Sequence, residues 1–148
     1  MENIRELKKF WSKKRVLITG HTGFKGSWLS IILTYLNSTI DGYSLKPKKN
    51  SLFNKSTIFK KLKSNTYLDI NNLTKLKKKI KDCKPEIIFH LAAQPLVIDS
   101  YKDPIKTLNT NIMGTANLLE SIRNIKSIKS VVIITTDKVY KIKKNNKA

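Results

Sequence analysis

Three glycines spaced three residues apart are the clearest chemical signal in this sequence. Gly20, Gly23 and Gly26 follow an apolar, β-prone run at 16–19 and precede a helical pattern of apolar residues over 28–36. In a strand–turn–helix unit, the first glycine permits a sharp turn, the second lets the backbone approach a pyrophosphate, and the third allows close helix packing. The helix N-terminus then directs N–H groups and a positive dipole end toward the phosphates. This context predicts a dinucleotide site, with a purely structural turn as the alternative.

A second reactive group of residues lies near the end of the chain, at Thr135, Thr136, Asp137 and Lys138. A hydroxyl, a carboxylate and an ammonium in succession can orient an alcohol and move a proton. Turn chemistry is the competing interpretation, because Thr and Asp are common after strands. The sequence contains no zinc-ligand cluster, no serine-nucleophile elbow and no Walker lysine after the glycines, and we expect no metal site.

Two further positions follow predicted strands. The stretch 42–46 contains no acid that would bind an adenosine ribose. Ser44 could instead bond a ribose hydroxyl and Lys46 could meet a 2′-phosphate, so the choice between NAD and NADP stays open. Asp69 could accept a hydrogen bond from an adenine amino group, or it could belong to the N-cap region of the next helix, which must begin near Asn71 or Asn72.

The motif HLAAQP at 90–95 closes another predicted strand. Ala92 and Ala93 leave room for a flat cofactor against the backbone. We interpret His90 as a core histidine with its hydrogen bonds satisfied, in preference to a catalytic one. Asn111 shares a helical stripe with apolar residues, so its amide should face the sheet and find partners, since an unpaired buried amide costs on the order of 2 kcal/mol.

Strand and helix signals alternate along the chain, which predicts a parallel sheet covered on both faces. The expected helices cover 3–10, about 24–36, 72–83 and about 104–124, and the expected strands cover 15–19, 39–45, 66–70, 86–91 and 131–135. Residues 46–64 are expected to form a loop with a weak helix. Right-handed crossovers then give an α/β, doubly wound Rossmann fold with strand order 3-2-1-4-5 and a ligand at the carboxyl ends of the strands.

The 148 residues predict one dinucleotide-binding domain at 15–140, preceded by a helical extension at 1–14 and followed by a basic tail at 141–148 that we expect to be disordered. No apolar run approaches the ~18 to 20 residues of a membrane span, and the N-terminus lacks a signal-peptide core. Cys83 is the single cysteine, so a reducing cytoplasm is expected.

The formal net charge of +20 comes almost entirely from lysine, with arginine only at positions 5, 15 and 123. Specific recognition of bases and phosphates relies on arginine forks. The lysines within 75–81 are expected mostly on the solvent face of a helix. We therefore predict a solvated basic surface, no specific nucleic-acid partner and no membrane partner, with salt-sensitive attraction to polyanions.

Several motifs spread over the chain match one known family. They are FW at 10–11, GHTGFKGSWLS at 20–30, GYSL at 42–45, HLAAQPLV at 90–97, SYKDP at 100–104, TNIMGT at 110–115 and TTDKVY at 135–140. Together they resemble the N-terminal half of extended short-chain dehydrogenase/reductases, the NAD-dependent epimerase/dehydratase family. The branch that acts on CDP-glucose is most similar, because the dTDP-glucose branch carries glutamate in the position of Lys138.

The resemblance implies a lyase that cycles a nicotinamide cofactor, NAD with NADP as the alternative. Hydride leaves C4 of glucose, water is lost across C5 and C6, and the hydride returns at C6. The product is a 4-keto-6-deoxy sugar nucleotide for surface polysaccharide, including lipopolysaccharide. Thr136 would hold the C4 oxygen, Asp137 would protonate the departing hydroxyl, and Lys138 would lie beside the reacting carbons. The expected cofactor-binding residues are Gly20, His21, Gly23, Phe24, Lys25, Gly26, Ser44, Asp69, Ile70, Leu91, Ala92, Ala93, Gln94, Asn111 and Thr135.

The family also has a Tyr-x-x-x-Lys pair on the helix after the fifth strand and a C-terminal half that binds the nucleotide sugar. Tyr140 and Lys144 fit the spacing but lie too close to the predicted strand, so we interpret that match as accidental. We therefore expect a truncated or split enzyme, inactive alone, with a complementing C-terminal polypeptide or a homo-oligomer as partner. The alternatives are the NAD(P)-binding part of a sugar-nucleotide epimerase and a non-catalytic dinucleotide-binding module.

Overall fold

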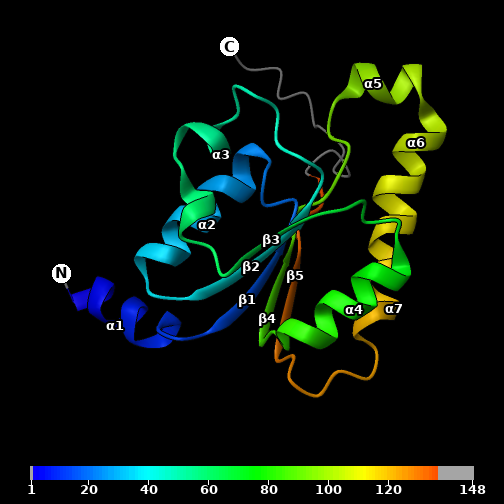
Figure 1. Cartoon of the computed structure of the whole chain (residues 1–148). Helices are drawn as coiled ribbons and strands as arrows, with labels where there is room; N and C mark the ends of the chain where they lie inside the picture. Colours follow the sequence, from blue (N-terminus) through cyan, green and yellow to red (C-terminus); the bar gives the residue numbers. More distant parts are fainter. Residues whose placement is uncertain (1, 137–148) are drawn as a thin grey trace, which may run out of the picture.

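A parallel five-stranded sheet organises the computed structural model, which describes residues 2–136 (Figure 1). The strands are β1 (Arg15–Thr19), β2 (Thr39–Ser44), β3 (Ser64–Tyr67), β4 (Ile87–His90) and β5 (Ser130–Ile133). Their order is β3-β2-β1-β4-β5 and every neighbouring pair is parallel. The predicted doubly wound α/β fold and its strand order are confirmed.

One helix precedes the first strand, and the others connect successive strands. They are α1 (Glu2–Trp11), α2 (Phe24–Tyr35), α3 (Leu52–Lys55), the 3-10 helix η1 (Ile58–Lys60), α4 (Leu73–Cys83), α5 (Val97–Lys102), α6 (Pro104–Leu108), the π-helix η2 (Asn109–Met113) and α7 (Gly114–Ile122). In Figure 1, α2 and α3 lie on one side of the sheet and α4 and α7 on the other. The expected loop with a weak helix at 46–64 is present as α3 and η1.

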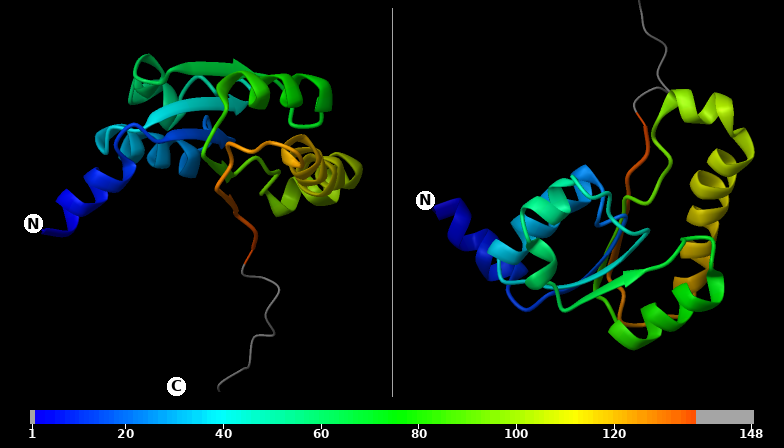
Figure 2. Two further views of the ribbon diagram at one scale, coloured as in Figure 1. Left: turned by 90° about the horizontal axis from the view of Figure 1, so that it is seen from below. Right: turned by 45° about the horizontal axis from the view of Figure 1, so that its top comes forward.

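Two apolar cores sandwich the sheet, one on each face, and the turned views of Figure 2 show both helical layers. Along β1, Val16 and Ile18 belong to the core beneath α2 and α3, while Leu17 belongs to the core beneath α4 and α7. Successive side chains of a strand point to opposite faces, so this central strand is apolar from Val16 to Ile18. Because β1 is buried from Val16 to Thr19, it gives the glycine turn that follows it a rigid base.

Two strands depart from the sequence prediction by two or more residues at an end, and β2 and β4 depart by one. The third strand, predicted at 66–70, is β3 at Ser64–Tyr67, because its register against β2 runs from Asp41 opposite Ser64 to Ser44 opposite Tyr67. The fifth strand, predicted at 131–135, ends at Ile133. Pairing with the neighbouring strand sets these limits, and residues such as Ser64 and Asn65 carry little β signal of their own.

The predicted helix at 104–124 is divided into α6, the π-helix η2 and α7, and it is preceded by α5, which the sequence did not predict. Asp103 caps α6, because its Oδ1 accepts a hydrogen bond from the Lys106 backbone N–H at 3.0 Å, and Pro104 occupies the first turn. π-Helical turns are rare and occur frequently at functional sites. This one lies beside the end of β4.

The lysines of α4 are mostly exposed, as expected, but Lys79 is an exception. Its Nζ lies 2.7 Å from Oδ1 of the buried Asp41 on β2, so this ion pair ties α4 to the sheet. The basic surface is therefore not wholly solvated. Within residues 2–136, no helix combines the length and the apolar composition that crossing a membrane requires.

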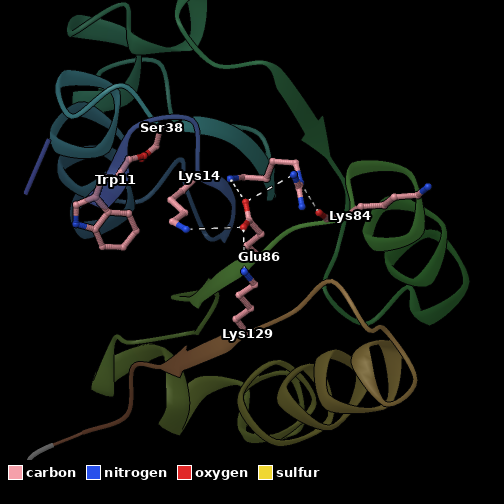
Figure 3. A network of polar contacts seen from close by, with 7 residues as sticks. Trp11, Lys14, Ser38, Lys84, Glu86 and Lys129 are labelled. Atoms are coloured by element: carbon pink, nitrogen blue, oxygen red, sulfur yellow. Dashed lines mark hydrogen bonds and ion pairs between the residues drawn. The ribbon is translucent and has the colours of Figure 1, made fainter. Parts of the chain in front are cut away.

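At the amino ends of the strands, Glu86 pairs with basic side chains from the starts of β1 and β5 (Figure 3). Its carboxylate accepts a hydrogen bond from the Arg15 backbone N–H at 3.2 Å and lies 3.9 Å from Lys14 Nζ and 3.7 Å from Lys129 Nζ. The Arg15 N–H, and then the nearby positive charges, lower the pKa of Glu86 below its usual value. This cluster joins the starts of β1, β4 and β5 and leaves their carboxyl ends available for ligand.

Candidate functional site

The turn after β1 has a geometry that only glycine suits. Gly20 has a φ of +73°, and a Cβ there would lie 2.6 Å from the carbonyl carbon of Leu91. A Cβ on Gly26 would lie 2.2 Å from the Gly20 oxygen, so the start of α2 packs directly on the turn. The first and third glycines are thus required by the loop itself.

Gly23 differs from its two neighbours in the motif. It is the N-cap of α2, with φ −73° and ψ 170°, which any residue can adopt. A Cβ there would meet only the Gly20 oxygen, at 3.3 Å. No side chain caps the helix, so the N–H groups of its first turn point outward with no acceptor of their own. This is the arrangement that receives a phosphate at a helix N-terminus.

A cavity of about 950 Å³ opens beside this turn, at the carboxyl ends of the strands. The predicted cofactor residues that line it are Gly20, Gly23, Phe24, Ser44, Asp69, Ile70, Leu91, Ala92 and Ala93. Residues from the loop after β2, from the loop before α4 and from the end of β4 therefore meet around one space. Its volume is at the upper end of the range typical of small-molecule sites.

The opposite wall of the cavity comes from α6 and the π-helix, of which the sequence analysis assigned only Asn111 to the site. Ile105, Lys106, Asn109 and Thr110 line it. The sequence pattern could have indicated this wall, because positions 106, 109 and 110 share one helical face. Lys106 adds to the positive charge that Lys46 brings to the other wall, and positive charge attracts phosphates.

Ser44 presents an oxygen to this cavity. Its Oγ lies 2.8 Å from Oγ1 of Thr22, and Thr22 donates its own hydroxyl proton to the Leu45 carbonyl at 3.0 Å. Ser44 must therefore donate to Thr22, because Thr22 has a single proton to give. The lone pairs of Ser44 are left to accept a hydrogen bond from a ligand hydroxyl.

Asp69 belongs to the turn before α4 and also lines the cavity, while its contact with adenine stays a prediction. Its Oδ1 accepts from the Asn71 backbone N–H at 2.8 Å, while Asn72 is the residue that caps α4. Its carbonyl accepts from the Tyr43 hydroxyl at 3.1 Å. Burial, and secondarily the Asp69 charge, raise the pKa of Tyr43 to about 12, so that hydroxyl stays a donor. Asp69 is thus held at the cavity wall by its own turn.

A buried polar chain links β1, β4 and the π-helix through His90. Thr19 Oγ1 lies 2.6 Å from Nδ1 of His90, and Nε2 lies 3.1 Å from Oγ1 of Thr115. Thr115 donates its proton to the Asn111 carbonyl at 2.7 Å, so Nε2–H donates to Thr115 and Nδ1 accepts from Thr19. Burial lowers the pKa of His90, which favours this neutral form. The prediction of a satisfied core histidine is confirmed.

Asn111 holds the loop that leaves β4. Its Oδ1 accepts from the Gln94 backbone N–H at 2.8 Å and its Nδ2 donates to the Gln94 carbonyl at 3.1 Å. The Gln94 side chain itself bonds to Leu96 and Thr107. The predicted inward amide of Asn111 is confirmed. Both residues position the Ala92–Ala93 wall rather than line the cavity.

His21 is placed away from the cavity. Its ring is fully buried, in edge contact with Phe53 and stacked on Tyr67, with centroid distances of 5.1 and 6.2 Å. A Cβ on Gly42 would lie 2.4 Å from the ring. Both ring nitrogens lack a hydrogen-bond partner, and burial lowers the pKa of His21 to about 4 despite the opposing polar groups of Asn65 and Tyr43. Lys25, Gly26 and Thr135 also do not line the cavity.

A comparison with known families fits this architecture. The model of the GDP-mannose 4,6 dehydratase family matches residues 17–144. The chain belongs to this family of NAD-dependent epimerases and dehydratases. The resemblance inferred from the motifs is thereby confirmed at the family level.

Two curated relatives of this family member are dehydratases. CDP-glucose 4,6-dehydratase of Salmonella typhimurium is 50% identical over 134 residues, which make up 90% of this chain and 37% of the relative. dTDP-D-glucose 4,6-dehydratase of Dictyostelium discoideum is 36% identical over 133 residues, 86% of this chain and 30% of the relative. The chain therefore spans only about a third of the length of these relatives.

Solved structures share the fold. Pal from Bacillus thuringiensis superposes with a TM-score of 0.75 at 29% identity, over 88% of this chain and 41% of that one. UDP-glucose-4-epimerase from Stenotrophomonas maltophila, solved with bound NAD, gives a TM-score of 0.73 at 20% identity, over 91% of this chain and 40% of that one.

The predicted catalytic residues follow β5. Ile134 still bonds through its N–H to the His90 carbonyl at 3.0 Å, and Thr135 and Thr136 come next, both exposed. Asp137 and Lys138 lie outside the described residues. Their assignment stays a prediction.

Proposed function

We propose that this chain forms the NAD-binding part of a sugar-nucleotide 4,6-dehydratase whose substrate is CDP-glucose. The observation that carries the proposal is the 50% identity to the Salmonella enzyme, which extends over 90% of the chain. The glycine turn, the open start of α2 and the adjoining cavity support it. CDP-glucose is proposed as the substrate from the name of that relative alone. In this proposal, the part of the enzyme that binds the sugar lies outside the matched region, so the residues present do not identify the substrate.

The residues present fit a dinucleotide. The N–H groups at the start of α2 would hold the pyrophosphate, with Gly23 letting it approach. Ser44 would accept a hydrogen bond from a ribose hydroxyl, and Asp69 would accept one from the adenine amino group. Ala92 and Ala93 would form a flat wall. NAD bound here supplies a hydride acceptor that is regenerated within each turnover. Lys46 keeps NADP as the alternative, because it could meet a 2′-phosphate.

The substrate chemistry is assigned to the segment after β5. Thr136 would hold the C4 oxygen, Asp137 would give a proton to the departing C6 hydroxyl, and Lys138 would lie near C5 and C6. Elimination of water needs a proton donor at the leaving oxygen, and a positioned carboxylic acid can provide it. We propose that the product, a 4-keto-6-deoxy sugar nucleotide, serves cytoplasmic synthesis of surface polysaccharide.

We infer that residues 1–148 alone do not complete the reaction. The relatives contain most of their length beyond the matched region. The sugar site and the general base would then come from sequence outside residues 1–148, in the same or in a complementing polypeptide, with self-association as the alternative. Tyr140 and Lys144 are not assigned as that base.

Similarity to a UDP-glucose 4-epimerase of Mycoplasma genitalium, which is 28% identical over 130 residues, supports epimerisation as a second candidate function within the family. An epimerase moves a hydride at C4 but does not expel water from C6, so it needs no proton donor at C6. The pair Asp137–Lys138 favours the dehydratase.

The test mixes this chain with the remaining portion of the Salmonella relative, NAD and CDP-glucose, and follows the sugar by NMR. We expect the 4-keto-6-deoxy product from the mixture and none from the chain alone. Asp137→Asn should lower the rate by roughly 10² to 10⁴, whereas Asp82→Asn, an exposed change on α4, should not. Formation of a C4 epimer, or turnover by the chain alone, would contradict the proposal.

A further inference from the structure

Tyr43 joins two of the turns that border the cavity. Its backbone carbonyl accepts a hydrogen bond from the Gly20 N–H at 2.9 Å, and its hydroxyl donates to the Asp69 carbonyl at 3.1 Å. The Tyr43 side chain is fully buried and belongs to the core beneath α4 and α7. Tyr43 therefore ties the glycine turn after β1 to the turn after β3 through a side chain that the core holds in place.

The hydroxyl of Tyr43 bonds to a peptide group and not to a side chain. The Asp69 carbonyl and the Ile70 N–H belong to one planar trans peptide, in which these two groups point in opposite directions. Holding the oxygen therefore also sets the direction of the N–H. The Asn72 N–H reaches the same oxygen at 3.0 Å. The Tyr43 hydroxyl thus orients a carbonyl that already has one other hydrogen-bond donor.

The turn after β3 offers a ligand one donor and one acceptor. Within residues 2–136, the Ile70 N–H has no acceptor, and the Asn71 N–H occupies only Oδ1 of the Asp69 carboxylate. Asp69 and Ile70 both line the cavity. Adenine presents the matching edge, because its amino group is a donor and the adjacent ring nitrogen N1 is an acceptor. Hypoxanthine presents the reverse edge, with a carbonyl at position 6 and an N–H at N1.

We propose that Tyr43 is a positioning residue for the adenine base of the dinucleotide. Its hydroxyl fixes the peptide group between Asp69 and Ile70, so that the Asp69 carboxylate meets the adenine amino group while the Ile70 N–H meets N1. A site arranged in this way rejects hypoxanthine, because donors would face donors and acceptors would face acceptors. This inference rests on the proposed function, since it names the residue that sets the base specificity of the dinucleotide cavity.

Calorimetric titrations with NAD and with nicotinamide hypoxanthine dinucleotide test the inference, because the two ligands differ only in the base. We expect the unaltered chain to bind NAD at least about tenfold more tightly. Tyr43→Phe keeps the ring but removes the hydroxyl, and it should reduce this preference to less than about threefold, mainly by weakening NAD. The matched control is Tyr67→Phe, because the Tyr67 ring stacks on His21 and does not line the cavity. The control should keep the full preference.

The ratio of the two affinities separates positioning from a purely structural role. Partial unfolding of a variant weakens both apparent affinities by the same factor and leaves their ratio unchanged. The inference is overturned if the unaltered chain shows no preference for NAD, if Tyr43→Phe weakens both ligands equally, or if Tyr67→Phe loses the preference as well. The dinucleotide site itself survives each of these results. A folded, unaltered chain that binds neither ligand would instead overturn the proposed function, and this inference with it.

Discussion

Two buried histidines at the ends of neighbouring strands are held in opposite ways. His90, at the end of β4, is 2% exposed, and both ring nitrogens are hydrogen-bonded to threonine hydroxyls. His21, two residues beyond the end of β1, is 0% exposed, and neither nitrogen has a partner. Polar partners fix His90 in one tautomer, whereas ring packing and the missing Cβ of Gly42 fix His21.

The difference shows how the two walls of the cavity are built. The β4 wall depends on a directional polar chain that reaches Asn111 and the Gln94 backbone. The glycine turn depends on shape, because His21 occupies the space that a side chain at position 42 would need. The stability of the β4 wall should therefore fall sharply when its hydrogen bonds are removed. The stability of the glycine turn should fall when the His21 ring becomes charged.

The largest effect is expected from His90→Phe. The substitution keeps an aromatic ring but leaves the Thr19 hydroxyl without its acceptor and Thr115 without its donor. The free energy of unfolding should fall by about 4 kcal/mol, as for other broken buried networks. Urea unfolding at pH 7 measures this. A loss below about 1 kcal/mol would mean that the polar chain does not hold the wall.

Acid should destabilise the protein through His21. Its folded pKa of about 4 lies below the unfolded value of 6.5, so the unfolded state binds the proton first. The stability is therefore complete above about pH 6.5 and declines as the pH falls toward 4, by about 3 kcal/mol in total. Burial of His90 acts in the same direction.

Urea unfolding from pH 7 to pH 5.5 measures this slope, because the lowered pKa of Glu86 removes stability only as the pH approaches its ordinary value of 4.5 and falls below it. His21→Phe should remove most of it, while His90→Gln should not. An unchanged slope in His21→Phe would assign the acid sensitivity to other groups.

Asn111→Leu should cost about 2 kcal/mol, because the Gln94 backbone N–H and carbonyl lose both partners. The dinucleotide affinity should fall a fewfold as the Ala92–Ala93 wall loosens. Asn117→Leu is the matched control, since its bonds to Ile70 and Asn71 are longer, at 3.4 and 3.3 Å. If the two variants lost equal stability and equal dinucleotide affinity, Asn111 would not be the residue that holds the Ala92–Ala93 wall.

The smallest effect is expected from His21→Phe at pH 7. The ring makes no hydrogen bond to lose, and Phe53 and Tyr67 already surround it. The free energy of unfolding, obtained from the melting temperature, should change by about 1 kcal/mol or less. A loss as large as that of His90→Phe would show that the two histidines are held alike.

Local patterns carried most of what the sequence predicted. The strand order follows from alternating elements and crossover handedness, and the inward amide of Asn111 follows from helical periodicity. The glycine turn was predicted because each glycine has a local steric reason, which the contacts of Gly20 and Gly26 display.

Features set by distant residues were not predicted. The start of β3 at Ser64 depends on pairing with Asp41 in β2. The interior position of His21 depends on Gly42 and Phe53, which lie far along the chain. The π-helical turn at Asn109–Met113 has no compositional signature, and Lys79 was drawn inward by a buried carboxylate.

The central claim is that the glycine turn and its cavity bind a dinucleotide, and calorimetric titration of NAD and NADP tests it most directly. Gly23→Leu is the decisive variant, because the backbone angles of Gly23 suit any residue and a Cβ there would meet only the Gly20 oxygen, while the new side chain would block the approach to α2. We predict saturable heat with the unaltered chain and none with Gly23→Leu, both samples being folded by circular dichroism. Absence of heat with either dinucleotide on the folded unaltered chain, or equal binding by Gly23→Leu, would contradict the account.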